Sequence, residues 1–404
     1  MVSNVSLRLA VVGAGPVGLT LALHAARTLP DARVTLFDAR SASADVLADP
    51  RTIALSLGSV QLLQRLGAWR AEAAQPIVEV HVSQQPPSLG GVLGGLLGEP
   101  EVRIRAIDEA VPMLGAVLGY GAIVVPLQQV WAEACEREPQ RLASRFGVPV
   151  TALKPLDGGV EVDAGICEAF DLAVVAEGGV FSDQLRKAVT HDYQQTAWVG
   201  TVTLQGARHG VAYERFTRHG PAALLPLKDG RAALVWCVNS ADDPVAELND
   251  VQRLAVLNTL FHPEVGRLVA VSPLMHFALG LNAERTLTDG RTVRIGNAAQ
   301  TLHPVAGQGL NLGLRDAFEL VRALAHVSAD HAAPTKDIDA VLRRLEWTRG
   351  PDRWAMIAAT DFLARSFTWQ LPGAGTARGL GLAALQAWTP VKSLLARQMM
   401  YGAR

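Results

Sequence analysis

The feature that most constrains this chain is a glycine-rich turn near its start, set between a buried strand and a helix. The segment "LRLAVVGAGPVGLTLALHAARTL" opens with the apolar run Leu7–Val12, passes Gly13, Gly15 and Gly18, and continues with helical periodicity. A second apolar run, "ARVTLFDAR", reaches Asp38. Strand, turn, helix and strand in this order predict a βαβ unit, in which the helix N-terminus directs free N–H groups at whatever lies against the turn.

Each glycine of this turn has a separate task in such a unit. Gly13 permits the tight turn, Gly15 lets a pyrophosphate approach the backbone, and Gly18 lets helix and strand pack closely. Asp38 stands twenty residues after Gly18, where a carboxylate accepts hydrogen bonds from ribose hydroxyls. The pattern predicts binding of a dinucleotide, with NAD and FAD both open. The alternative is a purely structural glycine turn.

Composition excludes several other classes of protein. Of the 404 residues, 49% are hydrophobic and 19% charged, and the net charge of −1 argues against electrostatic nucleic-acid binding. Cys135, Cys167 and Cys237 lack C-x-x-C spacing, so we expect no metal site, no disulfide framework and a cytoplasmic, reducing setting. No apolar run reaches the length of about eighteen residues that a membrane-spanning helix needs.

The order of patterns predicts two interleaved domains and a helical end. Residues 197–240 alternate in the manner of an antiparallel sheet, and the chain after Arg315 is mostly helical. We therefore predict an α/β fold with α+β inserts, in which a discontinuous nucleotide-binding domain carries a substrate domain. The predicted nucleotide-binding domain comprises 1–76, 113–186 and 277–345, the substrate domain 77–112 and 187–276, and the helical C-terminal region 346–404.

A second strand–turn–helix stretch lies late in the chain. "RIGNAAQTLHPVAGQGLNLGLRDAFELVRAL" holds Pro304, Gly307 and Gly309 in its turn and becomes an amphipathic helix from Leu310. A separate segment, "DPRTIALSLGSVQLLQRLG", places Arg51 just after the first βαβ unit, where a guanidinium gives charge-assisted hydrogen bonds to a pyrophosphate. The alternative is that Arg51 is a surface residue that caps a helix.

These motifs together resemble the FAD-dependent aromatic-ring monooxygenases. "GNAAQTLHPVAGQGLNLG" is similar to their second FAD motif, usually G-D-A-A-H-x-x-x-P followed by G-Q-G-x-N, and its form resembles the hydroxylases of ubiquinone biosynthesis. The segments Tyr213–Cys237, Thr360–Phe367 and Gly379–Met400 resemble the same enzymes, so the likeness covers nearly the whole chain. The resemblance implies a Rossmann-like FAD-binding domain of the p-hydroxybenzoate-hydroxylase type with an antiparallel-sheet substrate domain.

The resemblance also implies chemistry and site residues. A polyprenyl phenol would be hydroxylated on its ring with molecular oxygen, through a flavin hydroperoxide that water must not reach. Asn297 would meet the ribityl chain, and the helix after the glycines would face the pyrimidine end of the flavin. His303 is the titratable residue expected near the phenol, with a structural hydrogen-bonding role as the alternative. The expected cofactor contacts are Gly13, Gly15, Gly18, Asp38, Arg40, Arg51, Gln129, Asn297, Pro304, Gly307, Gly309, Leu310 and Asn311.

The chain departs from the family pattern at three places. Asn297 stands for Asp and Gln300 for His in the second FAD motif. The family's A-D-G-x-x-S-x-x-R loop has become "AEGGVFSDQLRK", with Glu177 for Asp and with Ser182 and Arg186 each one residue further on. This loop is associated with FAD and the nicotinamide cofactor. NAD(P)H as direct reductant is therefore in doubt, and a partner reductase or ordinary loop drift both explain the change.

Three functions stay open. The first is hydroxylation of a polyprenyl phenol in ubiquinone biosynthesis, the second a sister ring hydroxylase of different regiochemistry. The third is a non-catalytic flavoprotein-like subunit that scaffolds other ubiquinone-biosynthesis proteins. The C-terminal end suits either a peripheral contact with the inner face of the membrane or a core-packing helix. Its leucines and cations are Leu380, Leu382, Leu385, Leu394, Leu395, Lys392, Arg397 and Arg404.

Overall fold

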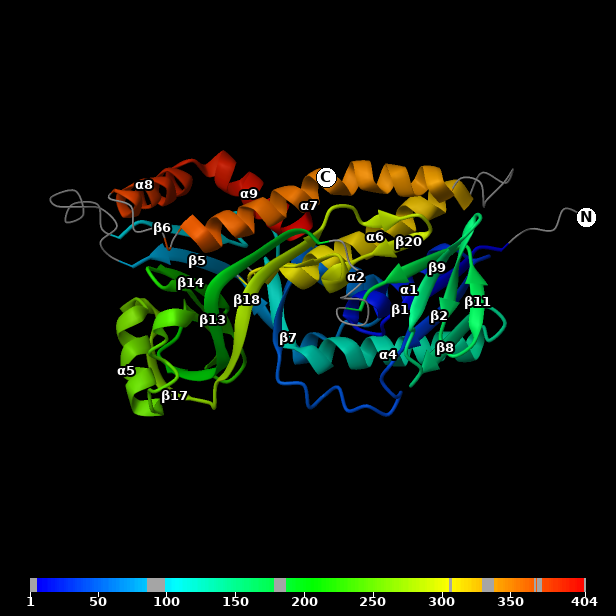
Figure 1. Ribbon diagram of the computed structural model, residues 1–404. Helices are drawn as coiled ribbons and strands as arrows, with labels where there is room; N and C mark the ends of the chain where they lie inside the picture. The colour runs from blue at the N-terminus through cyan, green and yellow to red at the C-terminus, as the bar shows by residue number, and fades with distance from the viewer. Residues whose placement is uncertain are drawn as a thin grey trace, which may run out of the picture.

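The computed structural model describes residues 6–85, 99–177, 187–304, 307–328, 338–366, 368 and 373–402. Figure 1 shows two lobes, one built on a mainly parallel sheet and the other on a large sheet that is mostly antiparallel, with α7 running along one side of both. The helices are α1 (Pro16–Thr28), α2 (Leu57–Arg65), α4 (Tyr120–Arg137), α5 (Asp250–Leu260), α6 (Gln308–Ser328), α7 (Ile338–Ser366), α8 (Ala374–Ala387) and α9 (Thr389–Tyr401).

The first lobe contains a six-stranded sheet in the order β19-β20-β12-β1-β2-β8. All its neighbours pair in parallel except β19 and β20. Its strands are β1 (Arg8–Val12), β2 (Arg33–Asp38), β8 (Leu142–Phe146), β12 (Leu172–Val175), β19 (Thr288–Asp289) and β20 (Thr292–Arg294). A sheet with these parallel neighbours is the arrangement that the βαβ pattern predicts.

Both faces of this sheet are covered. On one face, Leu9 and Val11 of β1 pack in a buried cluster with α1, α4 and α6. On the other face, Ala10 and Val12 pack against a small sheet of β9 (Ala152–Leu156), β10 (Gly159–Asp163) and β11 (Cys167–Phe170). Residues of one strand alternate between the faces, so burial on both sides explains why β1 reads as an unbroken apolar run.

The second lobe is a nine-stranded sheet, ordered β21-β18-β13-β16-β15-β14-β5-β6, with β17 paired to β13. Its strands are β5 (Glu79–Gln84), β6 (Glu101–Arg105), β13 (Lys187–Gln205), β14 (Val211–Thr217), β15 (Gly220–Pro226), β16 (Arg231–Asn239), β17 (Arg267–Val271), β18 (Met275–Glu284) and β21 (Gln300–Thr301). Helix α5 packs on this sheet through Leu257. The antiparallel sheet expected over 197–240 is confirmed as β13 to β16.

A three-stranded sheet, in the order β3-β7-β4, lies beside α2 and α4. Its strands are β3 (Thr52–Ser56), β4 (Gln75–Ile77) and β7 (Gly115–Gly119). The expected short helix before Gly67 is α2, and Gly67 ends it with a φ of 69°. Short 3-10 helices lie at η1 (Ala71–Ala73), η3 (Ser240–Asp242), η4 (Pro263–Val265) and η5 (Gly296–Ala298).

The long strands β13 and β18 join the two lobes. They pair along most of their length, so the domain boundary predicted between residues 276 and 277 falls inside β18. The boundary predicted between residues 345 and 346 falls inside α7.

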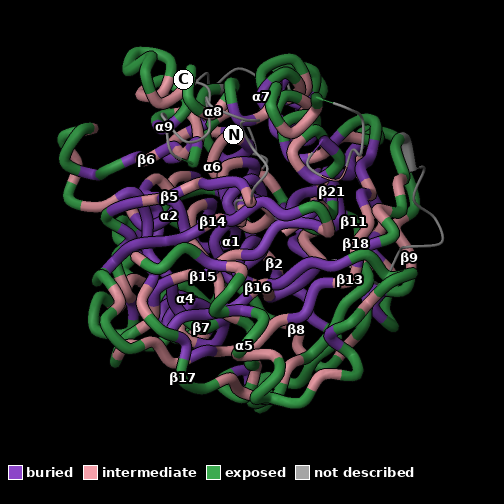
Figure 2. Tube along the Cα trace, turned by 90° about the vertical axis from the view of Figure 1, so that its left-hand side faces the viewer, coloured by how far each residue is buried: buried purple, intermediate pink, exposed green. Residues whose placement is uncertain are grey.

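Figure 2 shows buried backbone running continuously through the strands of the centre, with exposed segments on the outside. The three cysteines are free, and no helix among the described residues has both the length and the hydropathy to cross a membrane.

Candidate FAD site

The residues predicted to bind the cofactor lie at the ends of four neighbouring strands. Strands β1, β2, β12 and β20 run parallel, so their carboxyl ends lie at one edge of the sheet. Gly13 follows β1, Asp38 ends β2, Glu177 follows β12, and Gly296 with Asn297 follows β20. In open α/β sheets this edge is where ligands bind. Residues separated by more than 250 positions in the sequence therefore face one location.

The first glycine turn divides into two structural glycines and one open glycine. Gly13 has a φ of 104°, which a residue with a side chain rarely adopts, and its N–H donates to the carbonyl of Phe37 at 2.7 Å. A Cβ on Gly18 would lie 1.9 Å from the carbonyl oxygen of Gly13. By contrast, within the part of the chain that the structure describes, a Cβ on Gly15 would meet only the hydroxyl of Tyr120, at 3.7 Å. The space in front of Gly15 therefore fits the pyrophosphate expected there.

Asp38 is held rigidly at the end of β2. Its carboxylate accepts a hydrogen bond from the N–H of Ala14 at 2.6 Å and three from Arg40, two of them from the guanidinium at 3.0 Å. Burial raises the pKa of the carboxyl group, but these hydrogen bonds outweigh it, so the pKa of Asp38 lies below its ordinary value. The carboxylate stays ionised at neutral pH and links the glycine turn to Arg40. Its four acceptor positions are filled, so a ribose hydroxyl would have to displace the guanidinium of Arg40, which is 43% exposed.

Arg51 lies beside the same turn. Its guanidinium pairs with Asp49 at 2.7 Å and sits over the ring of Tyr120, 4.1 Å from the ring centre. Because the Tyr120 hydroxyl also faces Gly15, the ring connects Arg51 to the first glycine turn. Tyr120 is a residue that the sequence analysis missed. It opens α4 outside any glycine motif, and only folding brings it here.

The second glycine turn presents Asn297 to the same edge. Gly296 has a φ of 60°, and its Cα would lie 2.8 Å from a Cβ on Gly313, so α6 packs directly on the turn. The side chain of Asn297 is exposed and makes no hydrogen bond to any of the described residues. An amide left available at this edge fits a partner with hydroxyl groups, such as a ribityl chain.

The start of α6 leaves space in front of Gly309. A Cβ on Gly309 would meet no atom of the described residues within 4 Å, and the first N–H groups of α6 have no carbonyl four residues earlier in the helix. Gly307, with a φ of 59°, donates its N–H to the carbonyl of Pro304 at 3.0 Å, and Leu310 is half-buried in the first turn. An anion or a polarised ring edge is favoured at such a helix end.

The buried side chain of Asn311 is fully engaged within the protein. Its oxygen accepts from the N–H of Ser56 and the hydroxyl of Ser59, both at 2.8 Å. Its nitrogen donates to the carbonyls of Ala54 and Gly307, both at 3.0 Å. Asn311 therefore fixes the start of α6 against β3 and α2, and only its backbone is left for the cofactor role that the sequence predicts.

His303 is buried and lies next to β13. Its Nε2 is 2.9 Å from the side-chain oxygen of Gln195, and its ring meets the Tyr193 ring edge-on at 5.1 Å. Burial lowers the pKa of His303 to about 4. The imidazole is therefore neutral at pH 7 and a weak base. These contacts favour the hydrogen-bonding role over the role near the phenol.

The remaining predicted residues have diverse surroundings. Gln129 is exposed in the middle of α4, and its predicted cofactor contact stays a prediction. Glu177 is half-buried against Gly13, and burial, followed by the charge of Asp38, raises its pKa. The rest of the altered loop, including Ser182 and Arg186, lies outside the described residues.

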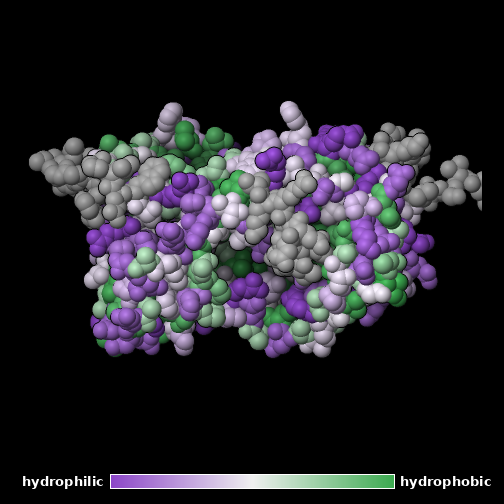
Figure 3. Space-filling view, in the orientation of Figure 1, coloured by the Kyte–Doolittle hydropathy of each residue, from purple (hydrophilic) through white to green (hydrophobic). Residues whose placement is uncertain are grey.

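Figure 3 shows that the face between the lobes is hollowed near its middle, with hydrophobic residues in the hollow.

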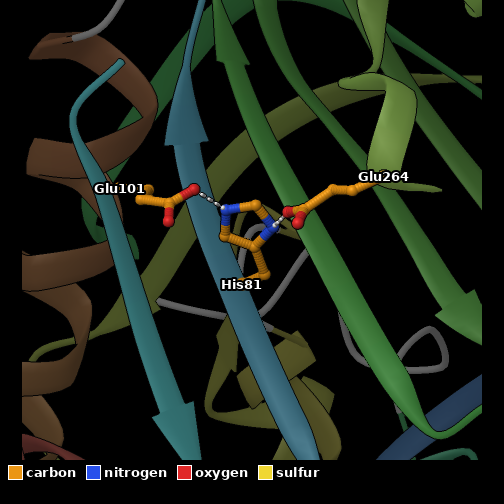
Figure 4. A group of neighbouring side chains, drawn as sticks. All are labelled: His81, Glu101 and Glu264. Carbon is orange, nitrogen blue, oxygen red and sulfur yellow. Dashed lines mark hydrogen bonds and ion pairs between the residues drawn. The ribbon is translucent and has the colours of Figure 1, made fainter. Parts of the chain in front are cut away.

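A separate cluster of titratable side chains lies in the large sheet, where His81 stands between Glu101 and Glu264 (Figure 4). The ring nitrogens of His81 are 2.8 Å and 2.7 Å from the two carboxylates. Although these atoms approach one another as metal ligands do, the guanidinium of Arg103 already contacts both carboxylates, each at 2.8 Å. Burial lowers the pKa of His81, so the two carboxylates share one guanidinium and a mainly neutral imidazole, and these contacts join β5, β6 and η4.

Comparison with known proteins identifies the family of the chain. Residues 177–340 match the FAD binding domain family. The chain is 32% identical to the ubiquinone hydroxylase UbiL of Rhodospirillum rubrum, over 96% of this chain and 88% of the relative. It is 29% identical to the 3-demethoxyubiquinol 3-hydroxylase of Escherichia coli, over 95% of this chain and 96% of the relative.

The fold also matches a solved structure that contains the expected cofactor. Klebsiella pneumoniae HpxO, crystallised with FAD and uric acid, superposes with a TM-score of 0.68 at 15% identity, over 99% of this chain and 98% of that one. At this identity the likeness establishes the fold alone. The full-length similarity to UbiL goes further, and on that basis the chain belongs to the family of FAD-dependent hydroxylases of ubiquinone biosynthesis.

Proposed function

We propose that this protein binds one FAD without covalent linkage and hydroxylates the aromatic ring of a polyprenyl phenol in ubiquinone biosynthesis. The observation that carries the proposal is the convergence of two open glycine positions, Gly15 and Gly309, with the carboxylate of Asp38 and the available amide of Asn297. These groups suit the pyrophosphate, the pyrimidine edge, the adenosine ribose and the ribityl chain of FAD, in that order.

Reduced FAD, when bound, supplies the activation of molecular oxygen. The residues of this chain bind and orient the cofactor and shield the reaction. The N-terminus of α6 would hold the pyrimidine side of the flavin and would favour negative charge on it, because the first N–H groups and the dipole of a helix attract anions. Neutral His303 and its partner Gln195 form a buried polar contact that ties the second glycine turn to β13.

The ring position is the open part of the proposal. The second FAD motif resembles that of 2-octaprenyl-6-methoxyphenol hydroxylase, while the Escherichia coli relative is described as a 3-demethoxyubiquinol 3-hydroxylase. Quinone profiling of a strain that lacks this protein tests the function and the position together. We expect a prenylated phenol that lacks one ring hydroxyl group to accumulate. A normal ubiquinone level and no new intermediate would refute the catalytic proposal.

A scaffolding subunit is the competing function. The intact glycine positions and Arg51 favour catalysis, because a scaffold has no need of a flavin site. Equilibrium dialysis of the purified protein with FAD separates the two. Stoichiometric binding and a yellow protein are expected, whereas no binding at all would favour the scaffold.

We propose that electrons reach the flavin from a partner reductase. The support is the altered "AEGGVFSDQLRK" loop, where Glu177 replaces the family's Asp. NADH or NADPH alone should then reduce the bound flavin slowly in stopped-flow measurements, even with a phenol present. Rapid bleaching of the flavin by either nucleotide would restore NAD(P)H as the direct donor.

We further propose that α8 and α9 rest on an anionic membrane surface at its inner face, from which a prenylated substrate is drawn. Leu382 and Leu385 pack inward against β6, as expected of core helices. Large apolar side chains on the outside are exposed, namely Leu380, Trp388, Val391, Leu394 and Leu395. The segment 373–402 contains three cations and no acidic residue. Figure 3 shows hydrophobic residues gathered along this edge. Amphipathic, cationic helices of this kind bind lipid interfaces.

Sedimentation with vesicles tests this contact. The protein should pellet with vesicles that contain phosphatidylglycerol and much less with pure phosphatidylcholine, since anionic lipid attracts the cations. Replacing both Trp388 and Leu394 by Ser should reduce pelleting. The control is Trp347→Ser, because Trp347 is 83% exposed but lies on α7. Equal loss of binding in both variants would contradict an assignment to α8 and α9.

A further inference from the structure

A buried polar network joins the two segments of the second FAD motif. It consists of Gln300 on β21, Asp316 on α6, and Arg349, Asp352 and Arg353 on α7, all at most 5% exposed. The two arginines and two aspartates balance in charge, and ion pairs of 2.6–2.9 Å connect Arg349 to both aspartates. Burying charge is costly unless it is paired, so this network requires a defined geometry.

Arg353 is the member that contacts the Asn297 turn. Its Nε donates to the Gln300 side-chain oxygen at 2.6 Å. Its Nη2 donates to the carbonyls of Glu284 at 2.7 Å and Ala299 at 3.1 Å. Ala299 lies two residues after Asn297, and Glu284 ends β18. One planar guanidinium therefore fixes the turn to the end of the long strand that joins the lobes.

Gln300 passes this constraint on to α6. Its side-chain oxygen faces the guanidinium of Arg353, which can only donate, and its nitrogen donates to Asp316 at 3.4 Å. Asp316 stands two helical turns after Gly309 and is paired with Arg349 at 2.9 Å. The Gln that replaces the usual His thus bridges a donor on α7 and an acceptor on α6. Gln300, which departs from the usual His of the family, therefore has a structural role.

We infer that Arg353 is a positioning residue for the flavin, which holds the Asn297 turn at a fixed distance from the first turn of α6. The inference rests on the proposed FAD site. Arg353 itself is 1% exposed, reaches the cofactor side only through backbone carbonyls and Gln300, and takes no part in the chemistry. Without its guanidinium, two carbonyls and an amide oxygen lose their common donor. The turn then keeps its backbone link to β18, in which the Glu284 N–H donates to the Ala299 carbonyl at 2.8 Å, but loses the side-chain link to α7.

The test is FAD binding by the folded apoprotein, with Arg141 as a matched control. Arg141 also donates from one guanidinium to several backbone carbonyls, those of Ala26, Leu29 and Ala32, but it does so at the C-terminal end of α1, away from the site. Arg353→Met should raise the Kd for FAD about tenfold or more and alter the visible circular dichroism of the bound flavin. Arg353→Lys should have an intermediate effect, since one ammonium group cannot span all three acceptors.

The control separates positioning from general destabilisation. Arg141→Met should lower the melting temperature while keeping the Kd for FAD within about twofold of the wild type. If Arg353→Met does not fold, Arg353→Lys and Gln300→Met decide, because each keeps part of the network. Unchanged affinity and an unchanged flavin spectrum in these folded variants would overturn the inference. Failure of the wild type to bind FAD would instead refute the proposed function.

Discussion

The sharpest prediction concerns Gly15, where the structure separates cofactor binding from folding. Its φ of −79° and ψ of −177° are accessible to any residue, and among the described residues an added Cβ would meet only the Tyr120 hydroxyl, at 3.7 Å. Gly15→Ala should therefore change the free energy of unfolding of the apoprotein by no more than about 1 kcal/mol, since backbone effects of Gly→Ala are of that size.

The same methyl group should damage FAD binding severely. It would occupy the place of the pyrophosphate, and each hydrogen bond to a charged group contributes about 1.5–3 kcal/mol. Losing about 3 kcal/mol corresponds to an affinity about a hundredfold weaker. Gly15→Val, with two more methyl groups, should abolish binding.

Urea unfolding of the apoprotein and fluorescence titration with FAD measure the two quantities separately. Gly18→Ala is the contrasting variant, because its Cβ would lie 1.9 Å from the Gly13 carbonyl oxygen and should impair both stability and binding. FAD affinity in Gly15→Ala within about threefold of the wild type would show that this turn does not face the pyrophosphate. A large loss of apoprotein stability would show that Gly15 is structural.

Three further predictions address the second turn and His303. Asn297→Ala should weaken FAD affinity roughly three- to twelvefold, the worth of one hydrogen bond, while Asn297→Asp should hold or tighten binding; equal affinities in all three proteins would exclude the ribityl contact. Gly309→Val should reduce product formation at saturating FAD far more than Asn297→Ala does, because the side chain would push the flavin away from α6, and normal turnover would refute that placement. Burial lowers the pKa of His303 to about 4 from 6.5, so the unfolded chain takes up a proton at a higher pH than the folded one, and stability falls as pH drops through this window. Between pH 7 and pH 5 this residue should account for about 2 kcal/mol of lost stability, so urea unfolding of His303→Gln should show that much less acid sensitivity than the wild type.

Local sequence patterns are enough to specify the two glycine turns of the proposed cofactor site. Gly13 and Gly18 tolerate conformations and approaches that no other residue does, so their spacing between an apolar strand and a helix specifies the turn without tertiary information. The same holds for Asp38 at the end of the second strand. These signals are short in range, and periodicity with glycine placement is enough to detect them.

The tertiary structure alone decided which distant residues complete the site. Tyr120 meets Arg51 and Gly15 because α4 begins beside β3, a pairing that no local pattern encodes. The use of Gln300 was hidden for the same reason, since its partners Asp316 and Arg353 lie on two later helices. The domain boundaries depended on β18, whose pairing with β13 carries the large sheet to Glu284. Hydrogen bonds between distant segments depend on how helices and strands pack, and packing is set by the whole chain at once.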